Sequence, residues 1–499
     1  MRSRVVSAML PLQIQADLMS SSVLFTRRGL LRLGGAAFAA ATMPMPGTSQ
    51  PASEPLRLRA ALSRVHLAGV PENSSAVWAY NGGVPGPEIR VRQGEPIRVR
   101  AENGLAEETT VHWHGIRTPN AMDGVPHLTQ APIPAGGEFL YEFDAVDAGT
   151  FWYHPHQRSS EQVGRGLYGP LIIEEHDPIR VDRDLIWMLD DWRMTDAGEI
   201  SDDFGNRHDA AHNGRVGNTV TINGTSPEPV AVRRGERVRL RLINAANARI
   251  FALDFGDLDP VIVALDGQPV TPHAPAEGIV VIGPAMRIDL VLDMAGHPGS
   301  RTTVRDVAYQ GLEYDLVEVR YDEAPLRKTV PDWSLDLPAN PLREPDIAAA
   351  TRHKVVFNGG MMGQMMMGDD AASMMQQMRD GAMWFINGQA ADGHVMDPLV
   401  SMALGTSHVF AMDNRTTWHH PIHLHGHSFR VIARNGEPTR YREWQDTVLV
   451  APEETVEIAF VADNPGDWMF HCHILEHQAA GMMAVVRVGD GATGHRANL

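Results

Sequence analysis

Four histidine pairs, each with one residue between the two histidines, constrain the fold of this chain more than any other feature. In a β-strand, residues i and i+2 point to the same face, so each pair directs two imidazoles to one side. One pair could be a surface or core accident, but four pairs in one chain predict strands arranged around a metal cluster. The pairs are His112/His114, His154/His156, His423/His425 and His471/His473.

Internal repeats indicate that the chain contains related β-domains. The segment 91–100, which reads Val-Arg-Gln-Gly-Glu-Pro-Ile-Arg-Val-Arg, is echoed at 232–241. The segment 149–156, Gly-Thr-Phe-Trp-Tyr-His-Pro-His, is echoed by Gly-Asp-Trp-Met-Phe-His-Cys-His at 466–473. Short runs of alternating apolar and polar residues, broken by Gly and Pro, favour β-sandwiches. The sequence therefore predicts an all-β fold.

Three β-domains follow from these repeats, with boundaries in a charged stretch and in a proline-rich segment. The first and third predicted domains contain the histidine pairs, whereas the second contains none. We expect little helix, and the best helix candidate is the methionine-rich segment 361–383. The predicted organisation is a signal region at 1–47 and domains at 55–175, 180–322 and 347–490.

Cys472 is the only cysteine, so the chain forms no intramolecular disulfide. In a strand its side chain points away from those of His471 and His473, so one strand would separate two metal sites, one on each face. A thiolate with two histidines and a distant methionine is the ligand set of a blue-copper electron-transfer site. The candidates for the other ligands are His420, His477 and Met482.

These motifs resemble the four copper motifs of the multicopper oxidases. They read His-Trp-His-Gly from 112, Trp-Tyr-His-Pro-His from 152, His-Pro-Ile-His-Leu-His-Gly from 420 and His-Cys-His-Ile-Leu-Glu-His from 471, with Met482 following. All four occur in the family's order, and the resemblance extends from about residue 55 to 490. It implies three cupredoxin-like Greek-key β-sandwich domains, with the second acting as a spacer without copper.

The resemblance also implies a site for four copper ions that couples four one-electron oxidations to the reduction of dioxygen to two waters. Type 1 copper would take His420, Cys472, His477 and, as weak axial ligand, Met482. Type 2 copper would take His112 and His423. The type 3 pair would take His114, His154, His156, His425, His471 and His473.

Proton delivery to dioxygen is assigned through the same resemblance. Asp123 matches the acidic residue that family members place near type 2 copper, so it is the candidate proton relay. An Asp-Gly pair such as Asp123-Gly124 is also an ordinary turn sequence. Gln478 follows His477 where several bacterial relatives have Glu, and an amide cannot exchange a proton at neutral pH.

The reductant is predicted from charge and from methionines. A net charge of −18 argues against a nucleic-acid partner and suits cationic substrates. Nine methionines between 361 and 383 resemble the Met-rich insertion of periplasmic cuprous oxidases, although an apolar helix face packed on the core is the alternative. Thioethers select Cu(I), so the segment is a candidate substrate-copper site. The methionines are Met361, Met362, Met365, Met366, Met367, Met374, Met375, Met378 and Met383.

Cuprous oxidase activity in copper tolerance is therefore the leading hypothesis, together with laccase-like activity on a small phenol. The alternatives are a general laccase, a ferrous oxidase and a non-enzymatic copper-binding protein. A copper nitrite reductase is disfavoured, because such enzymes have two domains and lack the paired His-x-His-Gly motifs.

The N-terminal region predicts export. Arg27-Arg28 followed by Leu30-Leu31 and an apolar run at 33–41 resembles a twin-arginine signal, which implies a periplasmic location. No other run of 18 apolar residues occurs, so we expect no membrane span. We also expect a monomer.

Overall fold

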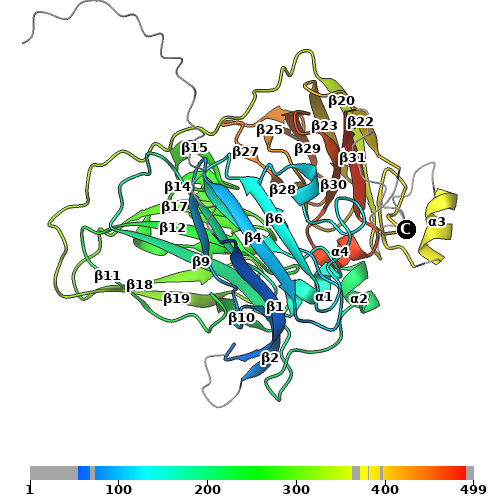
Figure 1. The fold of residues 1–499 in the computed structure, drawn as a ribbon. Coiled ribbons are helices and arrows are strands. Elements are labelled where there is room, and N and C mark those ends of the chain that lie inside the picture. The colour runs from blue at the N-terminus through cyan, green and yellow to red at the C-terminus, as the bar shows by residue number, and fades with distance from the viewer. Residues whose placement is uncertain (1–53, 68–73, 362–370, 380, 394–396, 490–499) are drawn as a thin grey trace, which may run out of the picture. The chain divides into compact units, whose positions relative to one another are not determined.

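The computed structural model describes residues 54–67, 74–361, 371–379, 381–393 and 397–489. The predicted signal region lies outside the described residues. Within them, most of the regular structure is β-strand (Figure 1). The prediction of an all-β fold with little helix is confirmed.

The first third of the described chain forms two four-stranded sheets. One has the order β2-β1-β4-β6, with β1 Leu56–Val65, β2 Ser75–Tyr80, β4 Pro96–Asn103 and β6 Glu138–Asp144. The other has the order β3-β8-β7-β5, with β3 Ile89–Arg92, β5 His112–His114, β7 Gly149–His154 and β8 Gly169–Glu174. The 3-10 helix η1 (Asn120–Met122) and helix α1 (Ser159–Gly164) lie in the connections.

The second third contains a six-stranded sheet, β10-β9-β12-β17-β14-β15, and a five-stranded sheet, β11-β19-β18-β13-β16. The strands of the larger sheet are β9 Arg183–Trp192, β10 Thr219–Ile222, β12 Arg237–Asn244, β14 Val261–Leu265, β15 Gln268–His273 and β17 Arg287–Asp293. The strands of the smaller sheet are β11 Val230–Val232, β13 Phe251–Asp254, β16 Ile279–Ile282, β18 Arg301–Asp306 and β19 Tyr314–Tyr321. The helical segments are α2 Arg207–Ala211, η2 Gly256–Leu258 and η3 Ala276–Gly278.

The last third contains a seven-stranded sheet, β21-β20-β23-β29-β25-β26 with β27 beside β25, and a five-stranded sheet, β22-β31-β30-β24-β28. The first has β20 Thr351–Gly359, β21 Trp384–Ile386, β23 Ser407–Asn414, β25 Phe429–Arg434, β26 Glu437–Pro438, β27 Trp444–Gln445 and β29 Thr455–Val461. The second has β22 Val400–Met402, β24 His420–Leu424, β28 Thr447–Val450, β30 Gly466–Cys472 and β31 Met483–Val488. The helices are α3 Ala371–Arg379 and α4 Leu475–Ala479.

The first sequence repeat has a shared structural basis. Both copies form a strand, a tight turn and a second strand, as β3–β4 and as β11–β12. Gly94 and Gly235 occupy the turns with φ of +83° and +80°, a conformation that favours glycine. In both turns the following glutamate accepts a hydrogen bond from a backbone amide, Arg92 N to Glu95 Oε2 at 3.0 Å and Arg233 N to Glu236 Oε2 at 2.8 Å.

Each third has its own apolar core, formed where alternate side chains of its two sheets face each other. The short helices α1 and α2, from the first and second thirds, both contact α4 of the last third, and the three lie together in Figure 1. This meeting point joins all three thirds beside β30, which carries Cys472.

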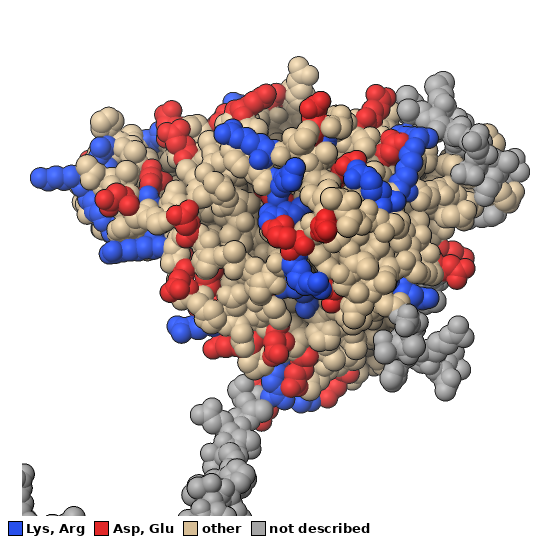
Figure 2. All heavy atoms as spheres, turned by 90° about the horizontal axis from the view of Figure 1, so that it is seen from above, with Lys and Arg blue, Asp and Glu red and all other residues tan. Residues whose placement is uncertain are grey.

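Charge is mixed on the face seen from above. Figure 2 shows acidic and basic side chains interspersed on one face, without a broad area of a single sign. Of the helices within the described ranges, none has the length and apolar character needed to cross a bilayer.

Candidate metal centres

Strand pairing brings the four histidine pairs into one place. β5 and β7 pair so that His112 lies opposite His154, and β24 and β30 pair so that His423 lies opposite His471. Histidines from the two ends of the chain then stack on one another: the rings of His112 and His425 are 4.0 Å apart between centroids, and those of His114 and His423 are 3.8 Å apart. All eight side chains are buried: His112, His114, His154, His156, His423, His425, His471 and His473.

His112 and His423 occupy equivalent positions in this cluster. The Nδ1–H of His112 donates to the carbonyl oxygen of Asp123 at 2.7 Å, and that of His423 donates to the carbonyl oxygen of Asp446 at 2.8 Å. In each ring Nε2 then carries a lone pair, and neither Nε2 has a hydrogen-bond partner among the described residues. A buried acceptor without a donor is costly unless a cation occupies the space beside it.

The other six histidines form two groups of three. In the first, His154 Nε2 lies 3.5 Å from His114 Nδ1 and 3.4 Å from His473 Nε2. In the second, His425 Nε2 lies 3.1 Å from His471 Nε2, and the rings of His156 and His471 are 5.3 Å apart. Donor atoms of His114, His154 and His473 lie within 4.8 Å of one another, and so do those of His112, His156 and His425 and those of His112, His114 and His423. The cluster thus offers more than one place for a metal ion.

Burial keeps these rings neutral. It lowers the pKa of His114, His154, His156, His425 and His473 well below the ordinary value, and the neighbouring histidines lower it further. A neutral imidazole has the lone pair that a metal ion needs. The chemistry of the donor set therefore fits metal ions rather than a proton network.

A second set of donors lies on the opposite face of β30. Cys472 Sγ is 3.5 Å from His420 Nδ1 and 3.7 Å from His477 Nδ1, and the two Nδ1 atoms are 3.2 Å apart. His477 donates its Nε2–H to the carbonyl oxygen of His212 at 2.6 Å, so its Nδ1 carries a lone pair directed at the other two donors. Burial raises the pKa of the Cys472 thiol, so a cation is needed to release its proton. A His₂Cys set of this kind fits copper.

Met482 lies close to this set along the backbone. Its side chain is buried, and its carbonyl oxygen accepts a hydrogen bond from Cys472 N at 3.1 Å. Because His471 and His473 belong to the histidine cluster while Cys472 faces the second set, the two sets are joined by covalent bonds through β30 and the residue after it.

The second third of the chain contributes a buried ion-pair network to the histidine cluster. Arg287 on β17 donates to both carboxylate oxygens of Asp446, at 2.8 and 2.5 Å, and its backbone N–H donates to Asp266. Asp446 Oδ1 in turn lies 3.2 Å from His114 Nε2. Gly115, next to His114, has φ of +85°, and a Cβ there would lie 2.3 Å from the guanidinium. No sequence motif pointed to these residues.

The prediction that the second domain is only a spacer is therefore incomplete, because it contacts the Cys472 set directly and reaches the histidine cluster through Asp446. At the Cys472 set, the contact is the carbonyl oxygen of His212, which follows α2. Two residues of the last third also contact this set. Thr416 Oγ1 is 2.8 Å from His420 Nε2, and the centroid of the Trp384 ring lies 4.1 Å from that of His477. Such outer contacts fix the orientation of ligating histidines.

Asp123 lies inside the histidine cluster. Its Oδ2 is 2.9 Å from His425 Nδ1 and its Oδ1 is 3.2 Å from His112 Nδ1, and its side chain is buried.

Gln478 is buried on α4, with its Oε1 3.5 Å from Ser159 Oγ. His408 is buried and bonded to His353 and Thr406.

Residues 362–370 of the methionine-rich segment lie outside the described residues. They include Met362, Met365, Met366 and Met367. The predicted helix is present in part, as α3. Met374 and Met383 are buried, whereas Met361, Met375 and, partly, Met378 reach the surface. The segment thus combines core packing with exposed thioethers.

Comparisons with known proteins agree with this architecture. Three family models, each described as "Multicopper oxidase", match residues 63–178, 183–301 and 367–492. The chain is 31% identical over 437 residues to "Multicopper oxidase MmcO" of Mycobacterium tuberculosis, covering 81% of each chain. It is 25% identical over 550 residues to "Copper resistance protein A homolog" of Pseudomonas syringae pv. tomato, covering 86% of this chain and 91% of that one.

A solved structure gives the same result for the fold. The multi-copper oxidase of Pseudomonas thermotolerans superposes with a TM-score of 0.77 at 34% sequence identity, covering 87% of this chain and 98% of that one. The prediction of three cupredoxin-like domains is thereby confirmed. The precise domain bounds stay predictions.

Proposed function

The chain belongs to the multicopper oxidase family, and on that premise we propose that it holds four copper ions and oxidises Cu(I) with dioxygen as acceptor. Type 1 copper is assigned to His420, Cys472, His477 and Met482, and type 2 copper to His112 and His423. The type 3 pair is assigned to His114, His154 and His473 for one ion and His156, His425 and His471 for the other. The observation that supports this most is the pair of buried lone pairs on His112 Nε2 and His423 Nε2, which have no hydrogen-bond partner among the described residues.

When bound, copper supplies one-electron chemistry at the Cys472 set and the four-electron reduction of dioxygen at the histidine cluster. The protein residues do the rest. Cys472 connects the two sets through its bonds to His471 and His473. The carbonyl oxygens of Asp123 and Asp446 hold the rings of His112 and His423 in one tautomer. Burial of all eight cluster histidines excludes bulk water, which limits the loss of partly reduced oxygen.

Asp123 is proposed as the residue that holds and transfers a proton near dioxygen. Its carboxylate contacts two histidines of the cluster, His425 and His112. Each dioxygen that becomes two waters consumes four protons, so a buried carboxylate at the cluster is placed to supply them one at a time.

Replacing Asp123 with asparagine tests this role, because the amide keeps the shape but cannot carry the proton. We expect the reoxidation of the reduced enzyme by dioxygen to slow by about 10²–10³-fold. Bleaching of the blue colour by a reductant without oxygen should keep its rate. Stopped-flow absorbance measures both. Equal slowing of the two half-reactions, or of neither, would contradict the assignment.

Cu(I) is the proposed physiological reductant. The support comes from the exposed thioethers of Met361 and Met375, from the acidic balance of the chain and from the name of the copper resistance relative. Export to the periplasm through the twin-arginine route is part of the same proposal, since it rests on Arg27 and Arg28.

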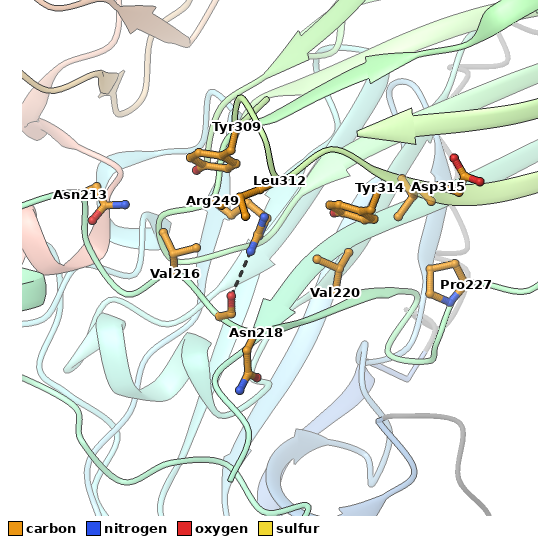
Figure 3. A pocket seen from close by; sticks show the side chains of 12 residues that line it. Asn213, Val216, Asn218, Val220, Pro227, Arg249, Tyr309, Leu312, Tyr314 and Asp315 are labelled. Carbon is orange, nitrogen blue, oxygen red and sulfur yellow. Dashed lines mark hydrogen bonds between the residues drawn. The ribbon is translucent and has the colours of Figure 1, made fainter. Parts of the chain in front are cut away.

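Laccase-like oxidation of a small phenol is the second candidate, and a cavity favours it. A surface cavity of about 640 Å³ lies on the second third of the chain, with Tyr309, Tyr314 and Arg249 in its wall (Figure 3). Arg249 is held by Asp191 and donates to the carbonyl oxygen of Gly217 at 3.0 Å. Asn213, at one end of the cavity, directly follows His212, whose carbonyl oxygen contacts His477.

Oxygen uptake by the copper-loaded protein distinguishes these reductants when Cu(I), Fe(II) and a phenol are compared side by side. We expect the largest kcat/KM for Cu(I) and a smaller one for the phenol. A larger kcat/KM for the phenol or for Fe(II) would make the protein a laccase or a ferrous oxidase. Copper binding without oxygen uptake would identify a copper-binding protein.

A further inference from the structure

The C-terminal end of α2 covers the Cys472 set. The last carbonyl groups of a helix lack partners within the helix. Here three successive carbonyl oxygens accept from outside it: that of Ala210 from Trp384 Nε1 at 2.6 Å, that of Ala211 from Met361 N at 3.1 Å, and that of His212 from His477 Nε2 at 2.6 Å. A segment of the second third is thus fixed directly against a proposed copper ligand.

Two imidazoles lie on this end of the helix. His208 and His212 are four residues apart, and their rings stack with 4.3 Å between centroids. The Nδ1–H of His212 donates to the carbonyl oxygen of His208 at 2.8 Å, which leaves the lone pair of His212 on Nε2. The His208 side chain is 77% exposed, so its ring has room to turn toward a shared ligand. Histidines at i and i+4 are a common metal-binding spacing.

The backbone of Met361 is bonded to the same end of α2. Met361 is 62% exposed, and its backbone N–H is bonded to Ala211, next to His212. Two imidazoles and one thioether form a donor set that suits Cu(I) and excludes hard cations, which prefer oxygen ligands. The neighbouring carboxylate, Asp209, is engaged by Arg193 and by the side chain of Asn206.

We propose that His208, His212 and Met361 form a docking site for Cu(I), the substrate. The inference rests on the proposed function and adds two histidines of the second domain to the substrate path. From this site the backbone of His212 leads to His477 through one hydrogen bond of 2.6 Å. Each docked Cu(I) gives up one electron and leaves as Cu(II); four such electrons and four protons reduce one dioxygen to two waters, the reaction of the family.

Silver(I) tests the site without turnover, because it matches Cu(I) in charge and softness but is not oxidised. Equilibrium dialysis of the copper-loaded protein should show one fewer bound Ag(I) per chain in the His208→Gln/His212→Gln variant than in the wild type. Crystals soaked in Ag(I) should show an anomalous peak between the two imidazoles. The glutamine at 212 keeps the backbone carbonyl, so the blue absorption should stay unchanged.

Kinetics give a second readout. In the double variant we expect the KM for Cu(I) to rise at least about tenfold. His297→Gln changes a distant exposed histidine and should leave this KM unchanged. If the double variant does not fold, His208→Gln alone keeps His212 and should show the same loss of Ag(I) in part.

The outcomes are distinguishable. Unchanged Ag(I) binding and KM in the double variant would overturn the docking site. An equal effect in His297→Gln would overturn it too. If the wild type binds Ag(I) between these histidines but does not oxidise Cu(I), the docking site is supported and the proposed substrate is wrong.

Discussion

Replacing Cys472 with serine should abolish both the intense red-light absorption and the turnover of the copper-loaded protein. Cys472 is the only cysteine in the sequence, and its main-chain bonds to His471 and His473 join the two donor sets. We expect turnover to fall at least about a thousandfold, which corresponds to ~4 kcal/mol in activation free energy. Visible absorbance and oxygen uptake measure the two effects.

The matched control is Met482→Gln. The hydrogen bond between this residue and Cys472 N involves the backbone carbonyl, so the side-chain change leaves it intact. Glutamine can also serve as an axial ligand, so blue colour and turnover should persist with a changed redox potential. Turnover in Cys472→Ser at a rate near that of the wild type would show that electrons take another route.

Replacing Arg287 with methionine should destabilise the protein and disturb the histidine cluster. Arg287 is fully buried between Asp446 and Asp266, and its Nε–H also donates to the carbonyl oxygen of Thr150 on β7, the strand of His154. Removing one partner of a buried ion pair costs about 3–5 kcal/mol, because the remaining charges lose their compensation. We expect that loss in the free energy of unfolding and a reduced copper content at the cluster.

The loss of stability caused by Arg287→Met should depend on pH in a defined direction. Burial raises the pKa of Asp266 to about 7, and the charge of Asp446 adds to the rise while Arg287 opposes it. Without the Arg287 guanidinium, the pKa of Asp266 in the folded protein rises further above its value in the unfolded chain. A raised carboxyl pKa adds stability at low pH that is lost as the pH rises through it. The difference in the free energy of unfolding between the wild type and Arg287→Met should therefore be smaller at pH 5 than at pH 8.

Denaturant unfolding of the copper-free proteins measures this difference. Arg487→Met is the matched control, since Arg487 and Asp467 form a partly exposed pair, for which about 0–1 kcal/mol is expected. Asp266→Asn in the Arg287→Met background should recover part of the stability. If Arg287→Met lowers the free energy of unfolding no more than Arg487→Met does, the buried network does not hold the three domains at the cluster.

The sequence predicted the parts of the molecule that depend on local spacing. A period of two places His112 and His114 on one face of β5, and it places Cys472 on the face of β30 opposite to His471. In the other three pairs the second histidine follows the end of the strand and still joins the cluster. The repeated Gly-Glu turns likewise depend on local conformation. These features need only a strand or a turn, which neighbouring residues determine.

Contacts between distant segments were not predictable in this way. Arg287, Asp266 and Asp446 are unremarkable strand or loop residues until packing buries them together, and 159 residues separate Arg287 from Asp446. His212 contacts His477 through a backbone carbonyl, which any residue type could supply. The role of the second domain therefore became visible only in three dimensions.

We propose that one buried thiolate site and one histidine cluster together hold four copper ions. Metal analysis and electron paramagnetic resonance of the fully reconstituted wild type test it most directly. Four copper ions per chain are expected, with one type 1 and one type 2 signal and a coupled, silent pair. Fewer than four ions at saturation, or no type 1 signal and no red-light absorption, would contradict it.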